Sequence, residues 1–322
     1  MLKFLAIDRF TILLFVMVIL ASIMPVSGDM ARYFGHITTI AIAILFFLHG
    51  AKISRQAMLE GIMHWKLHSI IFAFTFILFP ILGLMAKPII LPLLGQELYW
   101  GFLFLCFLPS TVQSSIAFTS MAKGNVAGAV CSASFSNVIG MMITPILVSL
   151  FITQSQSHSF DPTQAILKIT GLLLVPFILG QIVQTRFSPV LKRYPSVVKA
   201  FDQTTILMVV YGAFSGAVVS GLWQQVDGMT LMWIFVLCCV LLAVVMLLSL
   251  YTAKVLGFNA QDRKTIFFCS SKKTLASGVP MAQILFAGQP LGMLILPIMI
   301  FHQIQLMVCG IIANKWGNQE QE

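Results

Sequence analysis

The chain has 322 residues, of which 59% are hydrophobic and 9% are charged, and its mean hydropathy is +0.97. Soluble domains contain about 25% charged residues, so a soluble enzyme, a disordered chain and a secreted disulfide scaffold are excluded. The net charge of +9 comes from cations in short gaps between apolar runs, not from one solvated face as in a DNA-binding protein. The sequence therefore predicts an all-α polytopic membrane protein with no nucleic-acid partner.

Ten apolar runs are candidates to cross the bilayer, which takes about 20 helical residues. The first run follows Lys3 and Arg9 as in a signal peptide, but no Ala-x-Ala cleavage motif follows it, so we expect an uncleaved span. In chain order the runs cover residues 10–24, 34–49, 68–86, 98–121, 125–153, 165–184, 204–222, 231–256, 265–286 and 291–313.

The distribution of cations predicts the orientation. With the N-terminus in the cytoplasm, 14 of the 19 Lys and Arg fall in cytoplasmic segments and 3 outside, while Lys272 and Lys273 lie within the ninth run. Cytoplasmic loops carry an excess of Lys and Arg. We therefore expect both termini in the cytoplasm of a protein of the cytoplasmic membrane.

Two runs are interrupted, and they occupy matching places. Ten spans divide into five-span halves of opposite orientation, residues 1–153 and 165–313, and the fourth span of each half is broken: FLFLCFLPSTVQSSIAFTSMA and TIFFCSSKKTLASGVPMAQILF. Interrupted helices in corresponding positions of two halves indicate a transporter binding site. The sequence thus predicts two inverted five-helix repeats with the site at the two breaks.

Polar side chains at the breaks are the candidate substrate or ion ligands, because unwound backbone must line protein or a wet cavity. The alternative is that these side chains only satisfy freed backbone groups or pack helices together. The set comprises Ser110, Thr111, Gln113, Ser114 and Ser115 in span 4, Ser270, Ser271, Thr274 and Ser277 in span 9, Ser132 and Ser134 in span 5, and His302, Gln303 and Gln305 in span 10.

Lys272 and Lys273 are unusual, since a charge at bilayer depth is costly and by default functional. We expect one of them to face the cavity and meet an anionic substrate, or to stand where a coupling sodium ion would otherwise bind. The alternative is that they extend to an interface.

Intramembrane carboxylates are absent from the predicted spans, since all ten acids are expected in loops or tails. Proton coupling and aspartyl proteolysis both use such groups.

His49 and Lys52, and likewise His68, are expected as interfacial anchors. The cysteines, Cys106, Cys131, Cys238, Cys239, Cys269 and Cys309, lack metal-ligand spacing and are expected as buried hydrophobes. No enzyme and no cofactor is predicted, sodium aside.

Four segments carry a family resemblance: LFFLHGAKISR, LPSTVQSSIAFTSMAKGNVAGAVCSAS, FCSSKKTLASGVPMA and LPIMIFHQIQLMVCG. With them the chain resembles the sodium/bile acid symporter family nearly end to end, and most closely its YfeH-type bacterial branch, to which the seventh vertebrate member is related. The resemblance implies ten helices, with a panel domain of spans 1, 2, 6 and 7. It also implies a core domain of spans 3, 4, 5, 8, 9 and 10, in which broken helices 4 and 9 cross.

The resemblance carries the family's sodium ligands over only in part. Ser114 matches a family serine, Ser115 stands at the position of an Asn, and Ser277 matches the end of the span 9 motif. Ser271 stands at the position of the Glu that helps to bind both sodium ions, and lysines follow it. A sodium ion near Ser114 and Ser115 is therefore an open alternative.

Our leading hypothesis is a secondary active transporter, symporter-like, that carries a small organic anion by alternating access. The competing class is a non-transporting membrane regulator or sensor on the same scaffold. A monomer is compatible with either class.

Overall fold

The computed structural model describes residues 9–52, 64–152, 170–286 and 289–319, and these residues are helical nearly throughout. The helices in chain order are α1 (Arg9–Ile23), α2 (Gly28–Lys52), α4 (Trp65–Ala73), η2 (Phe74–Leu78), α5 (Phe79–Met85), α6 (Lys87–Phe107), α7 (Gln113–Met121), α8 (Val126–Phe151), η4 (Thr170–Leu174), α10 (Val175–Arg193), α11 (Pro195–Val219), α12 (Leu222–Gln225), α13 (Gly228–Val255), α14 (Ala260–Ser270), α15 (Leu275–Leu285) and α16 (Leu291–Asn318). The elements η2 and η4 are π-helical.

Eight of the described helical segments are long and apolar enough to cross a membrane, and residues 12–23 of α1 form a shorter apolar helix. Helix α13 shows the expected lipid-facing surface, since Phe235, Val240, Leu247 and Tyr251 are all exposed. Exposed apolar surface on this scale is unusual in a soluble monomer. The all-α polytopic membrane class is therefore confirmed.

Two of the gaps between the predicted spans, residues 87–97 and 185–203, are largely helical. The stretch 87–97 belongs to α6, which contains a kink at Gly95, where φ is +78° and ψ is 177°. Between α10 and α11 only Tyr194 stands outside a helix, because Pro195 begins α11 as its first residue, where its missing N–H is not needed. Gly95 therefore marks a kink within α6, and Pro195 marks a sharp corner between α10 and α11. The gap between the fifth and sixth predicted spans, residues 154–164, lies outside the described residues.

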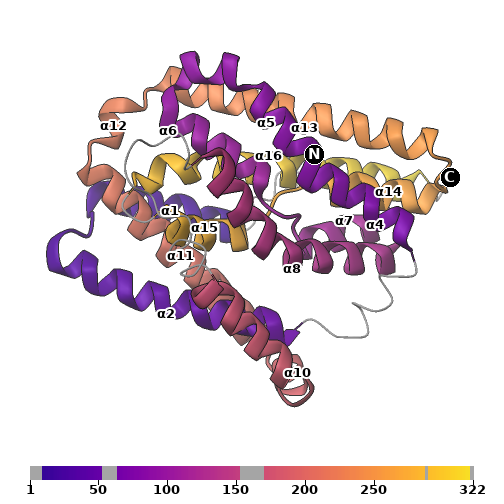
Figure 1. Cartoon of the computed structure of the whole chain (residues 1–322), viewed down its shortest axis with the longest axis horizontal. Helices are drawn as coiled ribbons and strands as arrows, with labels where there is room; N and C mark the ends of the chain where they lie inside the picture. The colour runs from indigo at the N-terminus through magenta and orange to yellow at the C-terminus, as the bar shows by residue number, and fades with distance from the viewer. Residues whose placement is uncertain (1–8, 53–63, 153–169, 287–288, 320–322) are drawn as a thin grey trace.

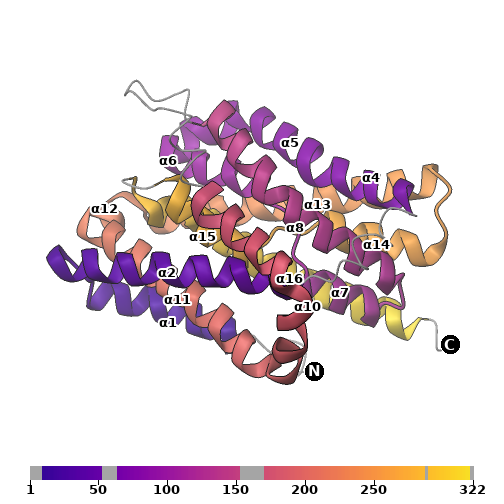
Figure 2. The same cartoon turned by 60° about the horizontal axis from the view of Figure 1, so that its bottom comes forward.

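Helices α1, α2, α10 and α11 lie together on one side of the protein, where α11 also packs against α15 and α16 (Figure 1, Figure 2). Helix α2 packs along α10, and α1 along α11. Two glycines permit the first contact: a Cβ on Gly50 would overlap the carbonyl oxygen of Phe177, and a Cβ on Gly180 would overlap that of Phe47. Small residues allow this close backbone approach between membrane helices.

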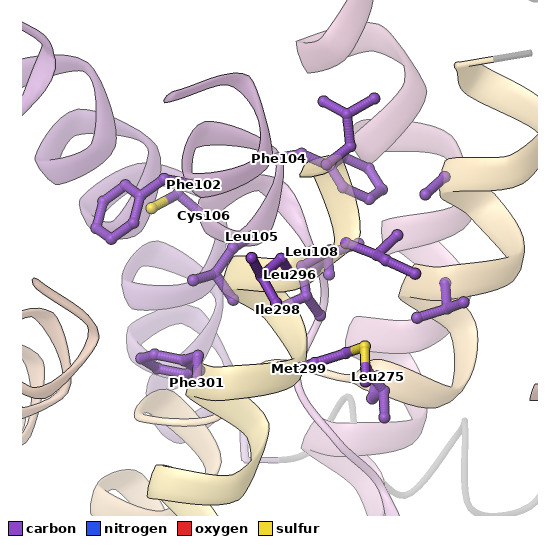
Figure 3. Packing of buried hydrophobic residues seen from close by; sticks show 14 of the residues in the cluster. Phe102, Phe104, Leu105, Cys106, Leu108, Leu275, Leu296, Ile298, Met299 and Phe301 are labelled. Carbon is purple, nitrogen blue, oxygen red and sulfur yellow. The ribbon is translucent and has the colours of Figure 1, made fainter. Parts of the chain in front are cut away.

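A continuous apolar core, to which α1, α2, α10 and α11 also contribute, surrounds the end of α6. Phe102, Leu105 and Leu108 pack there with Leu275 of α15 and Phe301 of α16 (Figure 3). Helix α16 can approach because Gly101 faces it: a Cβ at this position would lie 2.6 Å from the Leu294 carbonyl oxygen. This packing holds the end of α6 and the beginning of α15 next to each other.

Candidate functional site

Both predicted interruptions are confirmed, and they lie against each other. Helix α6 ends at Phe107 and α7 begins at Gln113, while α14 ends at Ser270 and α15 begins at Leu275. The Thr274 N–H donates to the Pro109 carbonyl at 3.0 Å, and the Ser110 hydroxyl donates to the Cys269 carbonyl at 2.6 Å. Two segments that lie about 160 residues apart in the chain thus form one structural unit, which we call the break pair (residues 108–112 and 271–274).

The carbonyl groups of residues 105–110, at the end of α6 and the start of the first break, all have hydrogen-bond donors, as buried backbone requires. The donors belong to the first break itself, to the second break and to α8. In order they are the Leu108 N–H for Leu105, Lys273 Nζ for Cys106, Thr144 Oγ1 for Phe107, Lys273 Nζ again for Leu108, the Thr274 N–H for Pro109 and Asn137 Nδ2 for Ser110.

Lys273 fills a pocket of carbonyl oxygens. Its Nζ donates to Thr75 at 2.8 Å, to Cys106 at 2.8 Å and to Leu108 at 2.7 Å, and it lies 4.1 Å from the ring centroid of Phe79. The Thr75 carbonyl is available because η2 is π-helical. The Phe79 N–H, its usual partner, bonds Phe74 instead, and the next residue is Pro80, which has no N–H.

Lys272 and Gln305 secure the second break. Lys272 Nζ donates to the Ser114 carbonyl at 2.8 Å and lies 4.0 Å from the ring centroid of Phe118. The Gln305 side-chain amide bonds the Lys273 backbone in both directions, at 2.8 Å to the N–H and 2.8 Å to the carbonyl. Both ammonium groups therefore hold the break pair together.

A cavity of about 300 Å³ opens beside the break pair. Its other walls come from α1, α2, α8, α11 and α16. From the breaks and the turns that follow them, the lining residues are Thr111, Val112, Gln113, Ser114, Thr274, Leu275, Ala276 and Ser277. The first turns of the half-helices α7 and α15 thus face the cavity, and helix N-termini carry partial positive charge.

The structure separates the candidate ligands into two groups. Seven of them line the cavity: Thr111, Gln113, Ser114, Thr274, Ser277, Ser134 and His302. The others do not line it: Ser110, Ser115, Ser132, Ser270, Ser271, Lys272, Lys273, Gln303 and Gln305. The expectation that a break lysine faces the cavity is therefore wrong: Lys272 and Lys273 are 0% and 1% exposed, and their ammonium groups bond backbone carbonyls.

Besides His302, the ionisable side chains that line the cavity are those of His49 and Lys52 of α2 and of Lys199 and Asp202 of α11. Lys52 Nζ lies 2.7 Å from Asp202 Oδ2. Asp202 within α11 and Asp262 within α14 correct the expectation that every acid lies in a loop or tail, since they are 7% and 3% exposed. His49 and Lys52 are cavity residues and not only interfacial anchors.

His68 is buried as well, with Nδ1 2.6 Å from the Ser132 hydroxyl.

A sequence signal for part of the cavity existed, because Lys199, Asp202 and Gln203 recur at the spacing of one helix face.

Two interrupted membrane helices that meet beside a cavity are typical of secondary transporters. The chain belongs to the SBF-like CPA transporter family, whose model matches residues 8–318. The resemblance to sodium/bile acid symporters is thereby confirmed at the family level.

Relatives of similar length cover nearly the whole chain. An uncharacterized protein of Pseudomonas aeruginosa is 50% identical over 98% of this chain and 94% of its own. The Escherichia coli protein named "Putative symporter YfeH" is 48% identical over 98% of this chain and 94% of its own length. Sodium/bile acid cotransporter 7 of Xenopus tropicalis is 30% identical over 86% of this chain and 81% of its own length. Membership in this family favours transport over catalysis.

Proposed function

We propose that the protein is a secondary active transporter that carries a small organic anion through the cavity beside the break pair. The observation that carries this proposal is the cavity itself, where two half-helix N-termini and two lysines, Lys52 and Lys199, converge. Its volume of about 300 Å³ matches the lower end of small-molecule sites.

The charge of the lining favours an anion. Lys52 and Lys199 stand against a single carboxylate, that of Asp202, which Lys52 already pairs. The N-terminal turns of α7 and α15 add partial positive charge. Gln113, Ser114 and Ser277 supply neutral polar groups that can orient the substrate.

Alternating access is supported by a second cavity, of about 590 Å³. Like the first cavity, it is lined by residues of both α2 and α11. Helix α2 contributes Gly35 and Thr38 to that cavity, but His49 and Lys52, near its other end, to the first. Movement of α1, α2, α10 and α11 as a panel against the remaining core helices would open one cavity and close the other. In this scheme the ten spans form two inverted five-helix repeats in the cytoplasmic membrane, with both termini in the cytoplasm.

Sodium is one candidate coupling ion, with Ser114 and Ser115 as its proposed ligands. The hydroxyl and carbonyl oxygens around them are neutral, and Lys272 Nζ lies 2.8 Å from the Ser114 carbonyl oxygen. A fixed ammonium so close repels a second cation, which weighs against sodium at this point.

Uptake by purified protein in liposomes tests the proposal. We expect accumulation of at least one member of a panel of impermeant organic anions, with taurocholate included because the vertebrate relatives are named for bile acids. Lys199→Gln should raise the half-saturation concentration about tenfold, the equivalent of one lost charge contact of about 1.4 kcal/mol. The matched control is Lys254→Gln, an exposed lysine at the end of α13.

Anion binding without flux would refute transport and favour the regulator class instead. Replacement of sodium by choline separates the coupling ions, because a sodium-coupled carrier loses accumulation and an uncoupled one does not.

A further inference from the structure

Three side chains at the wall of the cavity form a charge group that neither the break pair nor the family comparison explains. Asp202 Oδ2 is held by Lys52 at 2.7 Å, while His49 Nε2 lies 3.9 Å from Asp202 Oδ1. Asp202 is 7% exposed, and its Oδ1 has no hydrogen-bond donor among the described residues. A buried carboxylate oxygen without a donor is costly, and a donor that reached it would relieve that cost.

The distance between His49 and Asp202 identifies that donor. At 3.9 Å the neutral imidazole makes no hydrogen bond, but an imidazolium would be attracted to the carboxylate and could close the gap. Histidine is the side chain that gains a proton most readily near neutral pH. The free oxygen of Asp202 is thus arranged to receive the N–H of a protonated His49.

The charge balance then links the proton to the anion. With His49 neutral, Lys52 and Asp202 cancel, whereas a proton taken from water by His49 Nε2 gives the three groups a net charge of +1. A bound monoanion neutralises that charge, and release of anion and proton together restores the starting state.

We propose that His49, Asp202 and Lys52 form a proton site that couples one proton to each organic anion in symport. This inference rests on the proposed transport function and names its coupling ion.

Other titratable groups near the site are few. Among the described side chains of the cavity lining they are Lys199 of α11 and His302 of α16, while α1, α8 and α15 contribute none. Helix α10 packs along α2, but its charged residues Arg186, Lys192 and Arg193 do not line the cavity. Lys199 adds a fixed positive charge for the anion. His302 Nδ1 lies 2.9 Å from Gln305 Nε2.

The first experiment measures protonation of His49 without any flux. Carbethoxylation by diethyl pyrocarbonate, which attacks neutral imidazole, is followed by mass spectrometry on purified protein from about pH 5 to about pH 9. Asp202→Asn should lower the pH midpoint for His49 by about one unit or more, since an opposite charge at this range is removed. The midpoint for His36, exposed on the same helix, should not move. An unchanged midpoint for His49 overturns the proposal.

The second experiment measures coupling in sodium-free liposomes that contain the pH dye pyranine. Any anion of the panel that is transported should acidify the lumen as it enters, and an inward proton gradient of one pH unit should sustain about tenfold accumulation. His49→Gln should abolish both effects, and the matched control His36→Gln should retain them.

Gradient-driven accumulation in His49→Gln contradicts the coupling role. Failure of every panel anion in the wild type counts against the transport function, while the modification experiment still decides the proton site.

Discussion

Replacement of Lys273 by methionine tests whether its ammonium group holds the two breaks together. The variant keeps most of the side-chain volume but leaves the carbonyls of Thr75, Cys106 and Leu108 without their donor. At about 2 kcal/mol for each unsatisfied buried acceptor, the loss is about 6 kcal/mol. Methionine avoids the cost of burying a charge, several kcal/mol in a protein interior, so we expect a net loss of about 3 kcal/mol.

Thermal unfolding in detergent measures this loss. A thiol-reactive dye reports unfolding directly, since five of the six cysteines are buried and none forms a disulfide. With about 2 °C for each kcal/mol, Lys273→Met should unfold about 6 °C below the wild type.

Lys272→Met is the matched control, because Lys272 bonds a single carbonyl, and we expect a decrease of about 2 °C at most. Equal midpoints for the two variants would refute the structural role that the three carbonyl contacts give to Lys273.

Three further predictions concern packing, the first break and thiol access. Gly180→Ala should destabilise the α2–α10 contact by about 1–3 kcal/mol, because its Cβ meets the Phe47 carbonyl, whereas Gly171→Ala, with open space around it, should not. Thr144→Val should lower the free energy of unfolding by about 1–2 kcal/mol, since the Phe107 carbonyl loses a donor at 2.8 Å. The same thermal unfolding assay checks both variants, and midpoints equal to that of the wild type would contradict these two predictions. N-ethylmaleimide should label only Cys239 in the folded protein, as measured by mass spectrometry of peptides, and labelling of a buried cysteine would contradict the packing.

The two breaks could be located from the sequence because local chemistry alone makes them. Pro109 cannot continue a hydrogen-bonded helix, and runs of serine and threonine compete for backbone groups. The membrane class followed equally from composition, since long apolar helices leave too few polar residues to cover a soluble surface. The inverted repeat, the orientation and the panel and core domains remain predictions.

The role of the two lysines could not be read in the same way. A sequence shows that Lys272 and Lys273 lie at membrane depth, but not which oxygen atoms surround them. The Thr75 carbonyl that receives Lys273 lies about 200 residues earlier, and it is free only because a π-helical turn meets Pro80. Every residue has a backbone carbonyl, so the sequence does not reveal which carbonyls are free to accept a hydrogen bond. Only the tertiary structure could distinguish a lysine that faces a substrate from a lysine that bonds the backbone of the protein.

By itself the sequence determined that this chain is a membrane protein with two interrupted helices, because hydrophobicity and helix-breaking residues act over short stretches. The tertiary structure alone decided which charges face the cavity. Asp202 and Lys52 are 150 residues apart and meet only because α2 and α11 pack side by side. The sequence drew attention to the lysines at the breaks, whereas the lysines that line the cavity are Lys52 and Lys199, because Lys272 and Lys273 are buried against backbone carbonyls.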